Sequence, residues 1–409
     1  MAMDKAAEKP HALEEFARSG SVSIISLVDS LIAEAHALRA SDIHIDPTTE
    51  GLTVRLRIDG MLQDKFFFEK RIHPEIITRI KILSNLRTDE HQAAQDGRFR
   101  THAGEAAIDV RVSVTPTYYG ENAVLRLLAD KAEEFTLESL GFSKENSKKI
   151  MDAVKKPYGM ILATGPTGSG KTTTLYTILK QLNTKTVSII TIEDPVEYAV
   201  EGVTQIQINP RAGLTFGSGL RSILRQDPNI IMVGEIRDSE TASIAVNTAL
   251  TGHLILSTLH TNDSATTLPR LLDMGVDPYL VASTVNVAIG QRLVRRICDH
   301  CKEAYTLTEA ERESLGGQLF PGQLADAPQF YRGIGCAECD HTGYAGRLGI
   351  HEVMVIDSEI RDAILKKASA ANLKEIAKKN GMITMFADGF MKAEAGKTTI
   401  EEVLRTVSE

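Results

Sequence analysis

The residues best suited to chemistry in this chain lie in one stretch of eight, 165–172, which reads GPTGSGKT. It fits the phosphate-binding pattern G-x-x-x-x-G-K-[ST] at every defined position. Glycines let successive backbone N–H groups converge on a phosphate, and the start of a following helix adds partial positive charge. The lysine can reach the β- and γ-phosphates, and the threonine hydroxyl can ligate Mg²⁺. The residues expected to hold a nucleotide are Gly165, Pro166, Thr167, Gly168, Ser169, Gly170, Lys171, Thr172 and Thr173.

The elements around this stretch are those that the motif needs. Residues 160–163 form a short apolar run, which is typical of a buried parallel strand. Residues 173–179 carry apolar side chains at helical spacing. The alternative is a glycine-rich turn that binds nothing. The strand, the helix, the lysine and the threonine together favour a phosphate-binding loop.

Carboxylates follow two other predicted strands. Residues 187–192 lead into Glu193 and Asp194, and the apolar run 230–234 leads into Glu235. In a parallel sheet, reacting groups gather at the carboxyl ends of the strands. Glu235 can hold Mg²⁺ or polarise the attacking water, and Glu193 is the second candidate for activating water. A solvated acidic loop is the alternative interpretation of Glu193 and Asp194.

A histidine and two arginines join these acids. His260 ends a predicted strand, 253–260, at the edge where phosphates are expected, and we predict that it contributes to the site. Arg225 and Arg237 flank the strand that leads to Glu235. They are either structural ion-pair partners or phosphate sensors.

Two C-x-x-C pairs separated by 34 residues indicate a metal site. Two such pairs can fill the tetrahedral shell of Zn²⁺, which leaves no open position and predicts a structural site. Paired disulfides are the alternative, and His300 and His341 are bystanders or substitute ligands. The predicted zinc ligands are Cys298, Cys301, Cys336 and Cys339.

Composition limits the class of protein. The chain has 409 residues, enough for two or three domains, and 43% of them are hydrophobic. Its 46 basic and 54 acidic residues give a net charge of −8, which argues against a general nucleic-acid binder. No apolar run approaches the length of a membrane-spanning helix, and no signal peptide opens the chain. We therefore expect a cytoplasmic protein without a transmembrane segment.

The pattern of apolar residues predicts two domains. Residues 1–20 are expected to be disordered or a remnant of cloning, and residues 131–142 are expected to link the domains. The first domain, 21–130, is a small α+β domain with helices at 21–40 and 72–86. The second, 143–409, is α/β; it continues as helix over 273–296, holds the cysteine element 298–339 and ends in short helices over 352–409. The strands predicted in the first domain are 41–45, 52–60, 98–100, 107–114 and 122–128.

Arginines recur on the strands of the first domain. Such side chains usually form a solvated face of the sheet. This series has a role in function only if a phosphate lies opposite it. The series consists of Arg55, Arg57, Arg98, Arg111 and Arg126.

Four segments in order, 165–172, 191–198, 227–238 and 251–262, resemble the Walker A, Asp, Walker B and His boxes of the secretion ATPase superfamily. The resemblance is to its type II secretion and type IV pilus assembly branch. Residues 41–45, 57–60 and the tetracysteine segment are also similar to this branch, so the resemblance covers about residues 21–409.

The resemblance implies a cytoplasmic hexameric ATPase with a PAS-like first domain and a RecA-like second domain. It implies ATP, Mg²⁺ and Zn²⁺ as ligands, Glu235 as the catalytic Walker B acid, and Glu193 and Asp194 as the Asp-box acids. Arg111 and Arg126 match arginines that reach the nucleotide. The residues that match arginines near the site are Arg221, Arg225 and Arg237.

The resemblance also implies a role. Hydrolysis would close and open the two domains about a hinge at 129–142 and so drive polymerisation of pilins or pseudopilins. The partner would be the inner-membrane platform of the machine, with the ATPase bound peripherally at that membrane. The tetracysteine element favours the assembly branch over the retraction branch. One departure is that assembly ATPases usually carry another N-terminal domain, so this chain is either trimmed or a short paralogue.

Two other functions fit a phosphate-binding loop. A RecA-like nucleic-acid translocase would bind DNA tightly and with a steep salt dependence, which the net charge of −8 disfavours. A nucleotide-gated scaffold would bind ATP but scarcely hydrolyse it.

Overall fold

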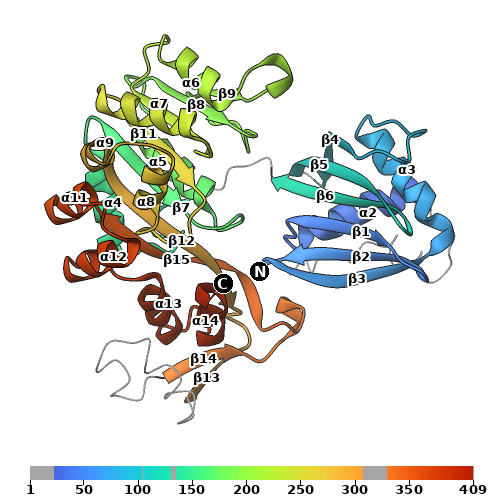
Figure 1. Cartoon of the computed structure of the whole chain (residues 1–409). Helices are drawn as coiled ribbons and strands as arrows, with labels where there is room; N and C mark the ends of the chain where they lie inside the picture. Colours follow the sequence, from blue (N-terminus) through green and yellow to red (C-terminus); the bar gives the residue numbers. More distant parts are fainter. Residues whose placement is uncertain (1–22, 105, 130–134, 307–328, 409) are drawn as a thin grey trace. The chain divides into compact units, whose positions relative to one another are not determined.

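A computed structural model describes residues 23–104, 106–129, 135–306 and 329–408, in two units, Met1–Glu133 and Glu134–Glu409 (Figure 1). The division falls inside the segment 131–142 that the sequence predicts as a linker. The N-terminal segment predicted over residues 1–20 lies outside the described residues. No helix in the described ranges is long and apolar enough to cross a bilayer.

The first unit is a six-stranded antiparallel sheet with the strand order β3-β2-β1-β6-β5-β4. Alternate residues of its strands, such as Ile108, Val110 and Val112 on β5, are buried in one core with the helices α2 and α3. One face of the sheet is therefore apolar and covered, and the side chains between these positions point to the other face. The elements are α2 (Ile24–Ala37), β1 (Asp42–Pro47), β2 (Gly51–Ile58), β3 (Met61–Glu69), η1 (Lys70–Ile72), α3 (His73–Leu83), β4 (Gln95–Ala103), β5 (Ala106–Thr117) and β6 (Gly120–Ala129).

The second unit is built on a seven-stranded sheet with the order β15-β12-β7-β11-β10-β8-β9. All neighbouring strands are parallel except β12 and β15, so the carboxyl ends of β7, β8, β10 and β11 lie at one edge. In chain order, the elements before β12 are α4 (Lys144–Val154), β7 (Gly159–Thr164), α5 (Lys171–Leu182), β8 (Ile189–Glu193), β9 (Thr204–Gln207), η2 (Pro210–Ala212), α6 (Phe216–Ile223), β10 (Ile230–Val233), α7 (Ser239–Leu250), β11 (Leu254–Leu259), α8 (Thr267–Asp273) and α9 (Pro278–Thr284). They are followed by β12 (Val285–Ile297), β13 (Lys302–Thr306), β14 (Gln329–Gly333), η3 (Ala337–Cys339), β15 (Tyr344–Val355), α11 (Ser358–Leu365), α12 (Ala370–Lys379), α13 (Met385–Glu394) and α14 (Ile400–Ser408).

Helices cover both faces of this second sheet. On β7, Met160 and Leu162 belong to the core that includes α6, α7 and α9, whereas Ile161 and Ala163 belong to the core that includes α4 and α5. A strand buried on both faces has to be apolar throughout, which explains the uninterrupted run before the phosphate-binding loop.

The prediction of continuous helix over 273–296 is wrong. Helix α8 ends at Asp273, α9 covers Pro278–Thr284, and the thirteen residues Val285–Ile297 form strand β12. The first eight residues of β12 are all buried. A strand buried on both faces shows no alternation of apolar and polar residues, so its pattern cannot be told from that of a buried helix.

Two smaller corrections concern the end of strand β15 and the presence of strand β3. Strand β15 runs through Val355, so the C-terminal helices begin at Ser358 and not at residue 352. Asp357 caps α11 by accepting a hydrogen bond from the backbone N–H of Ile360 at 2.9 Å, which explains why the helix starts there. Strand β3, which the sequence analysis did not predict, has three consecutive phenylalanines and little alternation.

The second half of the predicted linker is built into the second unit. Leu137 and Phe142 are buried in the core around α5. The backbone N–H of Gly349 on β15 donates to the carbonyl of Leu140 at 3.2 Å, and the Phe142 ring stacks on His351 with 3.5 Å between ring centroids. Residues 137–142 are therefore fixed to β15.

Candidate active site and cysteine cluster

The phosphate-binding loop joins β7 to α5, as the sequence predicts. Gly165 packs on β12, where an added Cβ would lie 2.4 Å from the carbonyl oxygen of Gln291. Gly170 precedes α5 with φ of +86°, a left-handed conformation that favours glycine. Helix α5 has no side-chain cap, so its first N–H groups are available to an anion. Within the described ranges the buried Ser169 hydroxyl has no hydrogen-bond partner, so the loop fits a phosphate ligand.

Lys171 lies over the loop that precedes it. Its Nζ donates to the carbonyls of Gly165 at 2.8 Å and Pro166 at 2.9 Å. Burial lowers the pKa of Lys171 to about 8, Glu235 opposes this shift, and Arg292 adds to it. The ammonium group is therefore buried near another cation, an environment that a phosphate would neutralise. Thr172 and Thr173 follow in the first turn of α5 and are half-buried.

Glu235, Arg237 and His260 form one cluster at the carboxyl edge of the sheet. Glu235 follows β10 and His260 follows β11, and these two strands pair in parallel. Arg237 Nε donates to Glu235 Oε2 at 2.6 Å, and His260 Nε2 lies 3.2 Å from the same oxygen. Glu235 is 8% exposed and close enough to influence Lys171. A carboxylate in this position can hold a metal-bound or attacking water near a phosphate.

Glu193 occupies a different environment. It is 2% exposed and accepts hydrogen bonds from the Tyr176 hydroxyl, from Thr191 Oγ1 at 2.5 Å and from Gln205 Nε2 at 3.2 Å. Burial raises the pKa of the Glu193 carboxyl. Three donors on β8, β9 and α5 thus surround this carboxylate, and its neighbour Asp194 is exposed.

The hydrogen bonds of Arg225 place it at the end of α6, outside the cluster of Glu235, Arg237 and His260. Its guanidinium group donates to the Arg221 carbonyl at 2.9 Å and to Ser222 Oγ at 3.1 Å, both at the end of α6. Arg221 in turn pairs with Glu240 on α7. These contacts stabilise the C-terminal end of α6, whereas Arg237 contacts the candidate catalytic acid Glu235.

The incorrect helix prediction hid two residues beside the loop. Gln291 and Arg292 lie on β12, next to β7, and both are buried. Arg292 lowers the pKa of Lys171, and Gln291 bonds to the loop itself. The β-branched residues between 285 and 289 were the signal that could have indicated a strand leading to these two polar side chains.

Four of the five strand arginines of the first unit form one row with a single aspartate. Residues directly opposite each other share a face of the sheet. Arg126 Nε donates to Asp42 at 3.0 Å, and Arg57 Nε lies 3.5 Å from Asp42. Like charges on opposed residues destabilise a sheet, so a row of this kind suits a multivalent anion. Across β2, β1, β6, β5 and β4 the opposed residues are Arg57, Asp42, Arg126, Arg111 and Arg98.

The four cysteines lie together. Their Sγ atoms are all within 4.8 Å of one another, with 3.8 Å between Cys298 and Cys336 and 3.8 Å between Cys301 and Cys339. Four sulfurs about 2.3 Å from a central Zn²⁺ would be roughly 3.8 Å apart, so the donor set and its spacing fit a tetrahedral metal. The backbone N–H of Gly343 also donates to Cys339 Sγ at 3.2 Å.

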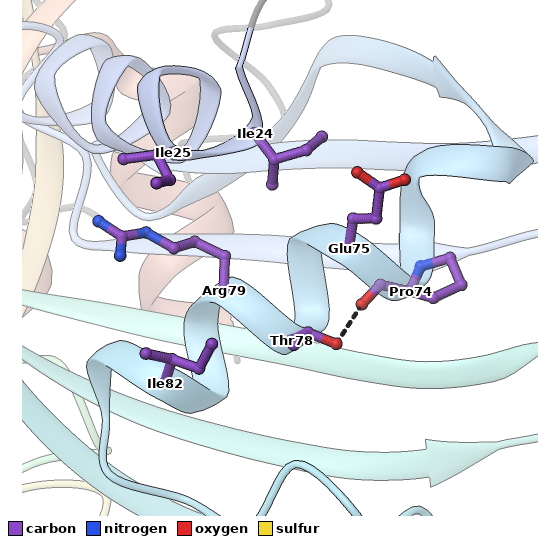
Figure 2. A pocket seen from close by; sticks show the side chains of 7 residues that line it. All are labelled: Ile24, Ile25, Pro74, Glu75, Thr78, Arg79 and Ile82. Atoms are coloured by element: carbon purple, nitrogen blue, oxygen red, sulfur yellow. Dashed lines mark hydrogen bonds between the residues drawn. The ribbon is translucent and has the colours of Figure 1, made fainter.

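An apolar groove of about 350 Å³ lies between α2 and α3 in the first unit (Figure 2). Ile24, Ile25 and Ile82 line it together with Arg79, whose guanidinium group is 3.7 Å from Asp29. Figure 2 shows the side chains of Ile24, Ile25 and Ile82 around the groove. The lining of this groove is therefore mainly apolar, unlike the glycine-rich loop after β7.

A largely parallel sheet with a phosphate-binding loop after β7 and an acid–arginine–histidine cluster at the same edge is the arrangement of a P-loop nucleotide-binding domain. The chain belongs to the family of type II/IV secretion system proteins, whose model matches residues 17–405.

Relatives and solved structures agree with this assignment. The chain is 48% identical to the type IV pilus assembly ATPase PilB of Thermus thermophilus over 93% of this chain and 42% of that protein. It is 43% identical to type II secretion system protein E of Aeromonas hydrophila over 99% of this chain and 79% of that protein. The chain therefore spans less than half the length of the first relative and about four fifths of the second.

Among solved structures, the pilus retraction motor PilT with bound ADP is 26% identical, with a TM-score of 0.63 over 94% of this chain and 97% of that one. The ATPase DotB of Legionella pneumophila, at 22% identity and a TM-score of 0.68 over 94% of this chain and 95% of that one, shares the fold. The predicted family and the predicted fold class are confirmed: an α/β P-loop ATPase unit after a smaller α+β unit, with a cysteine tetrad and a helical C-terminal part.

Proposed function

We propose that this protein hydrolyses ATP to ADP and phosphate as a hexameric motor for pilin or pseudopilin assembly. The observation that carries the proposal is the arrangement of Lys171 and the Glu235 cluster at one edge of the sheet. The similarity to a type IV pilus assembly ATPase and to a type II secretion system protein E supports the choice of machine.

In the proposed reaction the side chains at this edge have the following roles. When ATP binds, Lys171 Nζ gives up its hydrogen bonds to the carbonyls of Gly165 and Pro166 and donates to phosphate oxygens instead. The loop N–H groups hold the β-phosphate. Thr172 and Glu235 would hold Mg²⁺ through their side-chain oxygens, and the ion would neutralise phosphate charge when bound. Glu235 orients the attacking water, and Arg237 and His260 hold its carboxylate in place.

Of the two candidate acids, Glu235 suits the water-activating role better than Glu193. The carboxylate of Glu193 already accepts hydrogen bonds from Tyr176, Thr191 and Gln205. A water would have to displace one of these donors from a nearly inaccessible site. Glu193 thus serves to hold β8, β9 and α5 in position, with the loop at the start of α5.

Arg111 and Arg126 are proposed to neutralise the charge that develops on the transferred phosphate. They are directly opposite each other in the row of four arginines and one aspartate. Because residues 137–142 are fixed to β15, they do not contribute to the proposed hinge at 129–142.

The proposal makes a direct prediction for the purified protein. With Mg²⁺ and ATP it should release phosphate, and light scattering should give the mass of six chains of 44.7 kDa each. ATP binding without phosphate release would contradict the proposal and favour the nucleotide-gated scaffold. DNA binding that falls steeply between two salt concentrations would favour the nucleic-acid translocase.

Pull-down with the platform protein of a pilus or secretion machine would test the peripheral association with the inner membrane.

We also propose that the cysteine cluster binds one structural Zn²⁺. Mass spectrometry of metals should find one zinc per chain, and Cys336→Ser should lose it. Because a structural zinc stabilises the fold around it, chelation should lower the melting temperature. The exposed Ser283→Ala variant is the control, since the Ser283 hydroxyl donates to the carbonyls of Tyr279 and Leu280 in its own helix, α9. A chain without metal and with two disulfides would contradict the proposal.

A further inference from the structure

Gln291 connects the phosphate-binding loop to the helix that follows it. It lies on β12 one residue after Gly290, which is opposite Thr164, the last residue of β7. Its side chain is 2% exposed. Gln291 Nε2 donates to the carbonyl oxygen of Ser169 at 2.5 Å, and its Oε1 accepts from Thr174 Oγ1 at 2.9 Å.

The orientation of this amide follows from chemistry. A backbone carbonyl can only accept, so the Gln291 atom that faces Ser169 O has to be the nitrogen. The hydroxyl of Thr174 can donate, so it matches the remaining amide oxygen. Both ends of the buried side chain are thus satisfied by the loop and by the first turns of α5.

This bond fixes the direction of one peptide group in the loop. The peptide between Ser169 and Gly170 is trans, and in a trans peptide the C=O and the N–H point in opposite directions. Gln291 draws the Ser169 C=O toward β12, so the Gly170 N–H points away from β12. A phosphate has to approach from that side, because β12 occupies the other one.

Glycine makes this peptide easy to turn. Gly170 has φ of +86° and no Cβ that would resist a rotation of the preceding peptide plane. Without a donor at Gln291, the Ser169 carbonyl can turn toward the phosphate and replace a favourable N–H by a repulsive oxygen.

We propose that Gln291 is a positioning residue for nucleotide binding, which orients the Ser169–Gly170 peptide so that the Gly170 N–H donates to the phosphate chain. This inference rests on the proposed function, since it takes the phosphates of ADP and ATP as the ligand. It assigns Gln291 no contact with the nucleotide.

The test compares the nearly isosteric variants Gln291→Met and Gln291→Glu with the wild type. Each should weaken ADP binding and raise the KM for ATP about tenfold, the effect of one hydrogen bond to a charged group. The kcat at saturating ATP should change less than threefold, since the catalytic acid is not altered. Gln291→Glu keeps the shape of the side chain and places a carboxylate oxygen against the Ser169 carbonyl, so it tests the donor even if the methionine variant folds poorly.

Asn286→Leu is the matched control on the same strand. Asn286 is also a buried amide of β12, and its Nδ2 donates to the carbonyl of Tyr158 at 3.0 Å, before β7 begins. This variant should lower the melting temperature as the Gln291 variants do, yet leave ADP affinity within twofold. Equal ADP affinity in wild type and both Gln291 variants would overturn the inference, as would an equal loss in Asn286→Leu. A wild type that binds no ADP would overturn the proposed function instead.

Discussion

Glu235→Gln should still bind ATP with an affinity within a few-fold of the wild type, while its hydrolysis rate falls about 10²- to 10⁴-fold. The amide keeps the size of the carboxylate and can still accept from Arg237, but it can no longer take or polarise a proton of the attacking water. Binding would be measured by calorimetry and turnover by phosphate release under saturating ATP.

Glu375→Gln is the matched control for this substitution. Glu375 is an exposed acid on α12 that pairs with Lys378, and its loss should leave turnover unchanged. Glu193→Gln gives a second comparison. Normal turnover in Glu235→Gln together with a large loss in Glu193→Gln would exchange the roles assigned to the two acids.

Arg111→Ala and Arg126→Ala should each lower kcat by about 10³- to 10⁵-fold, the range found for arginines that stabilise phosphoryl transfer. The first unit should stay folded in the Arg126 variant, because Asp42 keeps Arg57 as a partner at 3.5 Å. Single-turnover phosphate release would separate this loss from a change in ATP binding. If both arginines act on the same charge, the double variant should lose much less than the product of the two single effects.

An arginine outside the row controls for the loss of positive charge. Arg71 lies on η1, is exposed and pairs with Glu69, and Arg71→Ala should leave kcat unchanged. Near-normal turnover in both Arg111→Ala and Arg126→Ala would show that the row does not act on the phosphate.

The chemistry of the second unit could largely be predicted from sequence because it lies at strand ends. A glycine-rich turn, an acid or a histidine directly after an apolar run marks the carboxyl edge of a parallel sheet. Lys171, Glu235 and His260 were located in this way, and the cluster that the structure forms from Glu235, Arg237 and His260 agrees with that edge. The C-x-x-C pairs located the cysteine cluster by the same kind of local pattern.

Features that depend on partners far apart in the chain could not be predicted. The environment of Glu193 depends on Tyr176 and Gln205, and nothing near Glu193 in the sequence indicates them. The arginine row depends on strand register, which a list of strands does not contain. The apolar pattern of strand β12 predicts helix because both of its faces are buried, and it therefore gives no indication of the position of Gln291.

The attachment of residues 137–142 to β15 decides how the protein can be divided for separate study. Ser143 caps α4 and would be the obvious first residue of a shortened chain. Such a chain would lack Leu137 and Phe142, uncover the ring of His351 and leave a hole in the core, where removing a phenylalanine side chain costs about 3–5 kcal/mol. A fragment of the second unit that keeps its core filled has to begin no later than Thr136.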